Sequence, residues 1–200
     1  MNVTLTYFDF SGSRGEECRL ALHIAGISFT DDRIDGAAWG TRKSASPWGN
    51  LPVLTVDGRE LGQSNAILQW VGRTAGLIPA DPWEAARHEA ILAACEELRH
   101  SFMPAMREKD PALKQAAREA FAAGYLQAWG ANMEAQLGKG PFVGGAVISV
   151  ADLKVYMCVN WFVSGVVDHI GTDVFAAFPK LLALHAAVKA RPDVVAWYAR

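Results

Sequence analysis

Apolar and polar residues alternate along the first part of the chain in patterns typical of short strands and helices. Val3, Leu5 and Tyr7 are spaced two apart, as on one face of a β-strand. Asp57-Gly58 is a dipeptide of tight two-residue hairpin turns. The elements predicted here are strands at 3–7 and 27–34, a helix at 14–25, an irregular or loosely helical connection at 36–47, a hairpin at 53–61, and a helix capped by Ser64.

The pattern changes at residues 76–82, where two prolines and a glycine indicate a linker. Beyond this linker no strand is predicted, and apolar residues recur at helical spacing. Pro104 is expected to kink or end the first of these helices, and Ser149-x-x-Asp152 predicts a capping box at the start of a later one. The helices predicted here span residues 83–106, 111–137, 150–167, 178–189 and 192–198.

The order of these elements defines the predicted fold class. A β-α-β unit followed by β-β-α matches a thioredoxin-like fold, a small sheet with helices on its faces. We therefore expect an α/β thioredoxin-like N-terminal domain at residues 1–79 and an all-α C-terminal domain at residues 81–200. Apolar residues make up 51% of the chain, which is enough for substantial cores.

Composition argues against several classes of function. The net charge of −2 gives no reason to expect a nucleic-acid partner. No apolar run approaches the roughly 20 residues of a membrane span, and no secretory signal is visible at the N-terminus. The cysteines Cys18, Cys95 and Cys158 are odd in number and widely separated, which favours a reducing cytosol over a disulfide framework. No metal site is predicted.

The stretch from Asn50 to Ser64 combines two features that suit a ligand. Pro52 opens a predicted strand, and if its peptide bond is cis, Leu51 turns its backbone N–H and C=O outward, where they could pair with a peptide ligand. The helix start behind Gln63 and Ser64 could receive a carboxylate on its unpaired N–H groups. The stretch therefore predicts edge-strand pairing beside an anion pocket.

Several motifs, in order along nearly the whole chain, resemble those of the glutathione transferase family. They are Leu5-Thr6-Tyr7-Phe8, Asp32-Arg33-Ile34 with Trp39 and Lys43, Leu51-Pro52-Val53-Leu54 with Gln63-Ser64-x-Ala66-Ile67, and Ser149-Val150-Ala151-Asp152. The chain is most similar to the sigma class, which includes the hematopoietic prostaglandin D synthases. Each motif is weak alone, but their common order and spacing make the resemblance specific.

The resemblance implies a catalytic role for Tyr7, whose hydroxyl would donate a hydrogen bond to the sulfur of the co-substrate glutathione. A free thiol has a pKa near 8.5, and a donor that binds the thiolate lowers that pKa. Arg14 would support the same ionisation from the start of the first helix. The loop between Phe8 and Arg14 is one residue longer than the family pattern, which affects the direction of Arg14.

The resemblance also implies a set of glutathione-binding residues. Trp39 and Lys43, four apart, would face the glycine carboxylate, and Asn50 stands where the family often has Gln or Lys. The remaining predicted contacts come from Leu51, Pro52, Gln63 and Ser64, and from Glu97, an acidic residue that would reach the site of the partner subunit in a homodimer. Without a ligand role, Gln63 and Ser64 form an ordinary helix start, and Glu96 and Glu97 form a solvated acidic face.

The preferred function is therefore a cytoplasmic glutathione transferase that joins the glutathione thiol to a hydrophobic electrophile. Two alternatives are a non-catalytic binding or structural protein on the same scaffold and a thiol oxidoreductase that uses Cys18, although Cys18 lies a turn inside its helix and is better explained as buried. Pro104 stands where prostaglandin D synthases carry a large aromatic residue, so we do not assign that isomerase activity. The expected pocket residues for the electrophile are Phe10, Phe102, Met103, Met106, Lys154 and Cys158.

Overall fold

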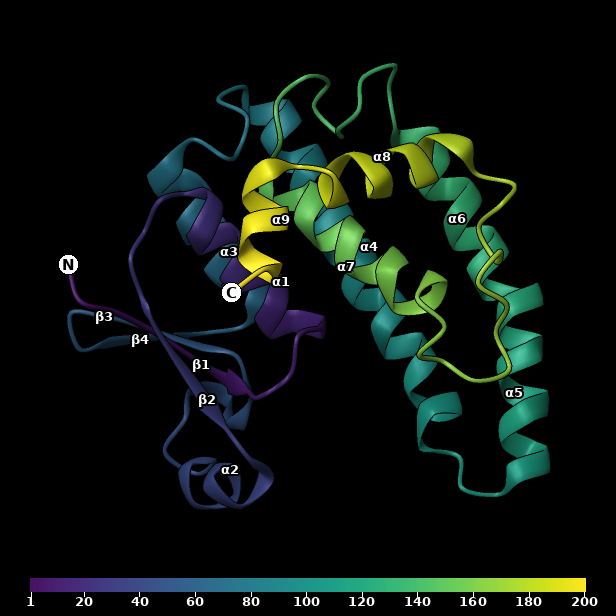
Figure 1. Cartoon of the computed structure of the whole chain (residues 1–200), viewed down its shortest axis with the longest axis horizontal. Coiled ribbons are helices and arrows are strands. Elements are labelled where there is room, and N and C mark those ends of the chain that lie inside the picture. The colour runs from purple at the N-terminus through teal and green to yellow at the C-terminus, as the bar shows by residue number, and fades with distance from the viewer. The chain divides into compact units, whose positions relative to one another are not determined.

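The computed structural model describes all 200 residues and divides the chain into two compact units. One unit consists of Met1–Ala80 together with Arg191–Arg200, and the other of Asp81–Ala190. The first contains the only sheet, and the second is helical (Figure 1). The predicted fold class, a thioredoxin-like α/β domain followed by a helical domain, is confirmed.

The first unit is built on a four-stranded sheet in the order β2-β1-β3-β4. Strand β1 pairs parallel with β2 and antiparallel with β3, and β3 pairs antiparallel with β4. The elements are β1 (Val3–Phe8), α1 (Ser13–Ile24), β2 (Thr30–Ile34), α2 (Gly36–Arg42), the 3-10 turn η1 (Pro47–Gly49), β3 (Val53–Val56), β4 (Arg59–Gly62), α3 (Ser64–Ala75) and α9 (Pro192–Tyr198).

Local sequence explains the strands of this sheet. The buried and half-buried residues of β1 alternate strictly, as the spacing of Val3, Leu5 and Tyr7 predicts. Asp57 and Gly58 both have positive φ, 49° and 81°, as a type I′ hairpin turn requires. The turn is held to the start of β1 because the Asn2 N–H donates to Asp57 Oδ1 over 2.7 Å.

The last ten residues, predicted as part of the C-terminal domain, pack with the first unit in the structure. Trp197 of α9 is almost buried and stacks on Phe29, with ring centres 6.1 Å apart. Its indole N–H donates to Glu16 of α1 over 2.6 Å. The hydrophobic pattern shows that α9 buries one face, but the partner of that face is set by tertiary packing.

The second unit consists of five helices, which depart from prediction at Gly124, at Pro104 and at the end of the helix predicted at 150–167, which stops at Val163. The stretch predicted as one helix at 111–137 is broken at Gly124, whose φ and ψ of −105° and −86° are not helical. The first helix runs through Pro104 because a proline in the last turn removes only one backbone hydrogen bond. The helices are α4 (Pro82–Arg107), α5 (Pro111–Ala123), α6 (Tyr125–Gln136), α7 (Val150–Val163) and α8 (Pro179–Lys189).

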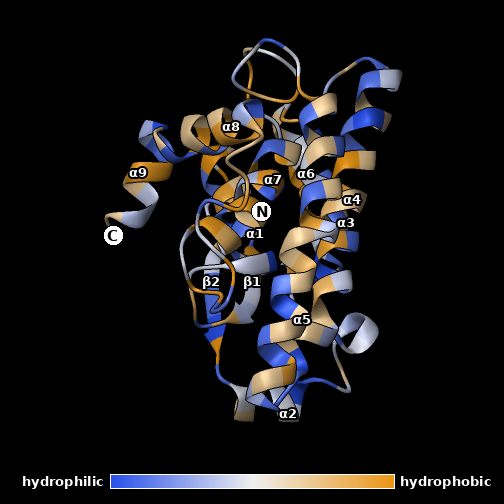
Figure 2. Cartoon of the chain, turned by 90° about the vertical axis from the view of Figure 1, so that its right-hand side faces the viewer, coloured by the Kyte–Doolittle hydropathy of each residue, from blue (hydrophilic) through white to orange (hydrophobic).

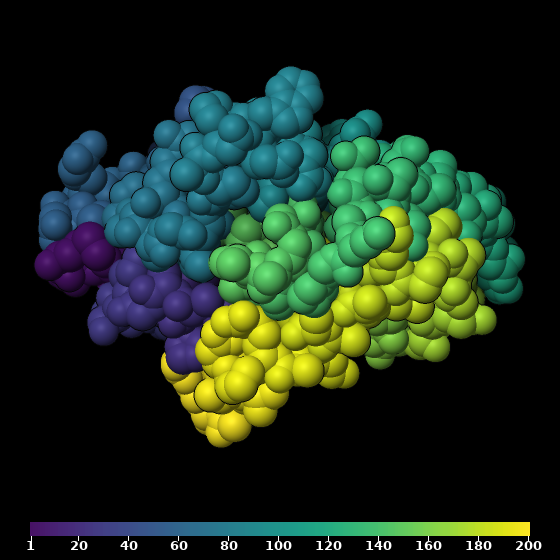
Figure 3. All heavy atoms as spheres, turned by 90° about the horizontal axis from the view of Figure 1, so that it is seen from above, coloured from purple at the N-terminus to yellow at the C-terminus, as the bar shows by residue number.

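Helix α7 is the buried centre of the second unit, and its start is held by the predicted capping box. The N–H and hydroxyl of Ser149 both donate to Asp152 Oδ2, over 2.8 and 2.7 Å. The Val143 N–H donates to the other oxygen of Asp152 over 2.6 Å, which fastens the loop 138–148 to the helix. Part of this loop is visible in green at the surface in Figure 3. Burial raises the pKa of Asp152 in spite of these bonds, which oppose the rise.

An aromatic cluster fills the space between α4, α5 and α7. Phe102 is fully buried and lies 4.8 Å from Phe121 and 5.3 Å from both Trp161 and Phe162, measured between ring centres. The colours of Figure 2 show polar and apolar positions side by side along α5, as expected for a helix that covers a core with one face. No helix of the chain combines the length and the apolar character that crossing a membrane requires.

We expect the stability of the fold to decrease in acid because of two buried histidines. Burial lowers the pKa of His185 from 6.5 to about 4, with Lys189 adding to the effect. Burial also lowers the pKa of His88, whose two ring nitrogens have no partner. Since the unfolded chain then binds more protons, the free energy of unfolding should fall as the pH drops from about 6.5 towards 4.

Urea unfolding at a series of pH values measures this decrease. His185→Gln can keep a hydrogen bond to Asn160, which lies 3.2 Å from the histidine nitrogen, but it removes the titrating group. The pH dependence of its unfolding free energy should therefore be shallower than that of the wild type. If the unfolding free energy of the two proteins changes equally with pH between 6.5 and 4, His185 is not a source of the acid sensitivity.

Candidate active site

Strand pairing brings distant parts of the chain to one edge of the sheet. Because β1 and β2 are parallel, their ends at Phe8 and Ile34 lie side by side. In the antiparallel pair β1–β3, Thr6 faces Val53, so β1 ends where β3 begins, and Val53 in turn faces Gly62 at the end of β4. The segments that follow β1, β2 and β4, and the one that precedes β3, therefore leave the sheet at the same edge. Apart from Tyr7, which is in β1 itself, all the residues of the first unit that are predicted to contact glutathione lie on these segments.

Tyr7 is the penultimate residue of β1 and is 5% exposed. Its ring lies against the backbone of α1, since a Cβ on Gly15 would come within 2.0 Å of the ring atom Cδ1. The ring centres of Phe8 and Phe10 each lie 5.6 Å from the centre of the Tyr7 ring. Tyr7 is thus enclosed by its own loop and by the glycine that allows α1 to approach.

The loop after β1 ends in an unusual backbone conformation. Ser13, the first residue of α1, has a φ of 56°, in the left-handed region that few non-glycine residues adopt. Arg14 follows as the second residue of the helix and is half-buried. Arg14 therefore lies at the start of the helix that follows Tyr7 and its loop.

Trp39 and Lys43 lie one turn apart at α2, as predicted. The Lys43 N–H donates to the carbonyl of Trp39 over 2.9 Å, and the lysine side chain is exposed. The indole of Trp39 meets the ring of Phe8 edge to face, with centres 6.4 Å apart, which places α2 at the end of β1. Asn50 is exposed, and its amide donates to the Trp48 carbonyl over 2.8 Å, so the amide is used within its own loop.

The segments on either side of the hairpin also follow the prediction, with one correction. The Leu51–Pro52 peptide bond is cis. Ser64 does not cap α3: the helix begins with Ser64 itself, and Gln63 occupies the N-cap position with a φ of 71° and no side-chain cap. Sequence patterns locate helix ends only to within one or two residues, which accounts for the shift. The side chain of Gln63 is exposed and that of Ser64 is buried.

The two parts of the chain match two family models. Residues 3–73 match the glutathione S-transferase N-terminal domain, and residues 96–200 match the glutathione S-transferase C-terminal domain. The chain belongs to the glutathione S-transferase family. Members of this family use glutathione as a co-substrate. The predicted resemblance is therefore confirmed, and the edge of the sheet described above lies within the N-terminal match.

Full-length similarity extends to named relatives. The hematopoietic prostaglandin D synthase of Gallus gallus is 32% identical over 196 residues, which cover 98% of this chain and 94% of that protein. The structure of prostaglandin synthase D of Nilaparvata lugens has a TM-score of 0.88 at 27% identity, with 100% and 98% of the two chains covered. The structure of a monomeric glutathione S-transferase of Necator americanus has a TM-score of 0.83 at 26% identity, and the match covers 100% of this chain and 97% of that chain.

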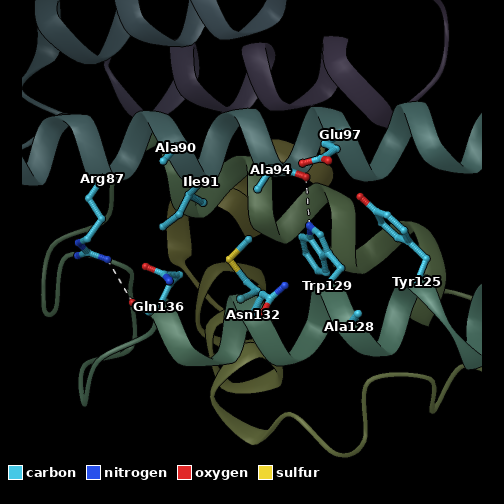
Figure 4. Close-up of a pocket in the computed structure, with 11 residues that line it drawn as sticks. Arg87, Ala90, Ile91, Ala94, Glu97, Tyr125, Ala128, Trp129, Asn132 and Gln136 are labelled. Carbon is cyan, nitrogen blue, oxygen red and sulfur yellow. Dashed lines mark hydrogen bonds between the residues drawn. The ribbon is translucent and has the colours of Figure 1, made fainter.

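Glu97 lies in the second unit, on the exposed side of α4. It is at the end of a groove of about 440 Å³ between α4 and α6, where Tyr125 and Trp129 face it (Figure 4). Glu96, expected to be solvated with it, instead accepts from the fully buried Lys154 over 2.5 Å and from Arg99 over 3.0 Å. The two adjacent glutamates thus differ: Glu96 neutralises interior charge, and Glu97 is exposed at the rim of the groove.

The residues expected to line the electrophile pocket fall into two groups. Phe102, Lys154 and Cys158 have no solvent exposure, so none of them forms an open pocket surface, which corrects that expectation. Phe102 belongs to the aromatic cluster, and Lys154 is used by Glu96. The exposed or half-exposed members are Phe10, Met103 and Met106. Sequence spacing cannot separate these groups, because pocket walls and core are both apolar.

Cys18 is the sixth residue of α1 and is fully buried, like Cys95 and Cys158. A thiol acts as a nucleophile only where its thiolate is stabilised and accessible. We therefore expect Cys18→Ala to retain most glutathione-conjugating activity and to lose some stability. Steady-state kinetics and thermal unfolding measure the two effects. Lost activity with unchanged unfolding would instead favour a thiol oxidoreductase based on Cys18.

Proposed function

We propose that this protein ionises the thiol of glutathione with the hydroxyl of Tyr7 and transfers the thiolate to a hydrophobic electrophile. The observation that carries the proposal is the strand register, because it gathers the ends of four strands at the edge where Tyr7 lies. A tripeptide along this edge could reach Tyr7, the segment before β3 and the start of α3 together. Membership of the family supplies the co-substrate.

The chemistry rests on the difference in charge between a thiol and a thiolate. At neutral pH a thiol with a pKa near 8.5 is mostly protonated, and only the thiolate attacks an electrophile effectively. The Tyr7 hydroxyl donates a hydrogen bond to the thiolate, and the positive charge of Arg14 adds to this stabilisation. Each unit by which the thiol pKa falls corresponds to about 1.4 kcal/mol of selective stabilisation.

The two carboxylates of glutathione would be held at opposite ends of the edge. The ammonium of Lys43 and the indole N–H of Trp39, one turn apart, suit the glycine carboxylate. The start of α3, at Gln63 and Ser64, has the positive end of the helix dipole and backbone N–H groups, which suit the γ-glutamyl carboxylate. Asn50, Leu51 and cis Pro52 lie between these two anchors along the chain.

The chemical class of the electrophile can be identified by screening the protein with glutathione and electrophiles of three types. Aryl halides, hydroperoxides and prostaglandin H2 cover substitution, reduction and isomerisation by a glutathione thiolate. Pro104 lies in the last turn of α4, and its small ring gives us no reason to prefer the isomerisation. The three free cysteines suit a reducing compartment such as the cytosol.

Tyr7→Phe tests the mechanism directly. We expect turnover to fall by roughly 10²-fold, in the range for a positioned proton donor or acceptor, with glutathione affinity little changed. Ultraviolet absorbance of the bound thiolate, titrated against pH, reports the thiol pKa. A mutant with the wild-type titration midpoint would exclude the role of Tyr7. Absence of turnover with every electrophile in the wild type, with glutathione bound, would favour a non-catalytic binding protein.

We further propose that the protein is a homodimer in which Glu97 reaches the glutathione ammonium in the site of the partner subunit. The exposure of Glu97 on α4 supports this assignment, because a residue that acts on another chain must lie at the surface. The exposed groove beside it gives the helix room to meet a second copy. The alternative is a monomer, because the glutathione S-transferase of Necator americanus to which this chain is similar is monomeric.

Glu97→Gln distinguishes these outcomes. In the dimer we expect the mutant to raise KM for glutathione more than it lowers kcat, as loss of ground-state binding does. Glu89→Gln is a matched control, since Glu89 is also exposed on α4 but lies outside the groove lining. Light scattering gives the oligomeric state. A monomer with unchanged KM in Glu97→Gln would show that the site is complete within one chain.

A further inference from the structure

The interior of the first unit holds a charged side chain that the proposed mechanism does not use. Arg19 of α1 has no solvent exposure, and neither has Glu16, one turn before it. A charge removed from water is costly unless opposite charges and hydrogen bonds satisfy it. The contacts of Arg19 therefore indicate which part of the fold this group holds in place.

Arg19 uses four hydrogen bonds of its planar guanidinium to join three segments. Nε donates to Asp31 Oδ1 of β2 over 2.8 Å, and Nη1 donates to Glu16 Oε2 over 3.2 Å. The other two bonds reach backbone carbonyls: Nη1 donates to Phe10 over 2.9 Å, and Nη2 donates to Phe8 over 3.1 Å. The carboxylates anchor the guanidinium, and its remaining donors hold the last residue of β1 and the loop that follows it.

The loop that Arg19 holds is the one that contacts Tyr7. Phe8 is the next residue in the chain, and the ring of Phe10 lies 5.6 Å from the ring of Tyr7. The guanidinium carbon of Arg19 is itself 5.8 Å from the centre of the Tyr7 ring. One buried group thus holds the backbone on the C-terminal side of Tyr7 and also lies near its ring.

Helix α9 completes this arrangement through Glu16. One carboxylate oxygen of Glu16 accepts from Arg19, and the other accepts from the indole N–H of Trp197 over 2.6 Å. Glu16 is therefore held on both sides, which restricts the position of the guanidinium. The polar chain runs from α9 through α1 to the loop after β1, all within the first unit.

We propose that Arg19 is a positioning residue for thiol activation: it fixes the loop at Phe8 and Phe10 so that the Tyr7 hydroxyl is directed at the glutathione sulfur. This inference rests on the proposed function of Tyr7. Arg19 touches no substrate in this scheme. A lysine would keep the charge but not the fork of donors, because its single ammonium cannot reach both carboxylates and both carbonyls in the same geometry.

Arg19→Lys separates positioning from simple stabilisation. The wild type and the variant are titrated with bound glutathione, and kcat/KM is measured across the same pH range. We expect the thiolate midpoint to move by about one unit to higher pH and kcat/KM at neutral pH to fall about tenfold, with recovery in alkali. Affinity for S-methylglutathione, which has no ionisable thiol, should stay within about twofold because its carboxylate anchors lie on other segments.

Arg118→Lys is the matched control in the second unit. Arg118 is also buried and also binds backbone carbonyls, those of Ala105 and Asp168, over 3.2 and 3.4 Å. Its substitution should lower the melting temperature without moving the thiolate midpoint. Trp197→Phe keeps an aromatic ring but removes the donor to Glu16, so it should shift the midpoint in the same direction as Arg19→Lys by a smaller amount.

The outcomes distinguish this inference from the function on which it rests. A wild type that binds glutathione without ionising its thiol would contradict the role of Tyr7. A normal wild-type signal with an unmoved midpoint in folded Arg19→Lys would overturn the role of Arg19 alone. Where Arg19→Lys does not fold, Trp197→Phe decides: a shift to higher pH supports the positioning role, and an unmoved midpoint overturns it.

Discussion

The pairing of β1 with strands on both of its sides is the interaction on which the candidate site depends. Its parallel partner β2 and antiparallel partner β3 force the end of β1 to lie beside the end of one strand and the beginning of another. A slip of one residue would move Tyr7 to the opposite face of the sheet, because side chains in a strand alternate. The burial of Val3, Leu5 and Tyr7 on one face opposes such a slip.

Both units keep charged groups in their interiors and satisfy them with short polar contacts. In the first, Arg19 and Glu16 connect α1 to the loop after β1 and to α9. In the second, Asp152 accepts from Ser149 and Val143, so one carboxylate holds both a helix start and a surface loop. Buried charges are a poor source of net stability, but their directional bonds select one backbone arrangement. In the first unit that arrangement includes the surroundings of Tyr7.

The proposed chemistry asks little of the protein beyond the accurate placement of a hydroxyl. In this proposal glutathione carries the nucleophile, and the fold would supply a donor for its thiolate and anchors for its carboxylates. Anchors on exposed side chains, such as Lys43 and Gln63, can be held by helix ends alone. The proposed donor requires a closer fit: Tyr7 is enclosed by Gly15 and two phenylalanines, whereas Lys43 and Gln63 are exposed.

The sequence alone determined the features that depend on neighbours along the chain. The alternation in β1, the Asp57-Gly58 turn, the capping box at Ser149 and the order of elements all follow from local spacing and propensity, and together they predicted the fold class. Helix ends were less certain: Gly124 breaks a predicted helix, and α3 begins at Ser64 instead of after it. Local preferences near a helix end differ by little, so packing decides its exact position.

Only the tertiary structure decided which distant side chains meet. No sequence pattern indicates that Trp197 joins the first unit, and Glu96 and Glu97 look alike in the sequence, although only Glu96 pairs with Lys154. Arg19 was an ordinary helical arginine in the sequence, because hydrogen bonds to the carbonyls of Phe8 and Phe10 leave no trace in residue types. Spacing along a chain reports which face of an element is buried, and the identity of what covers that face arises from long-range packing.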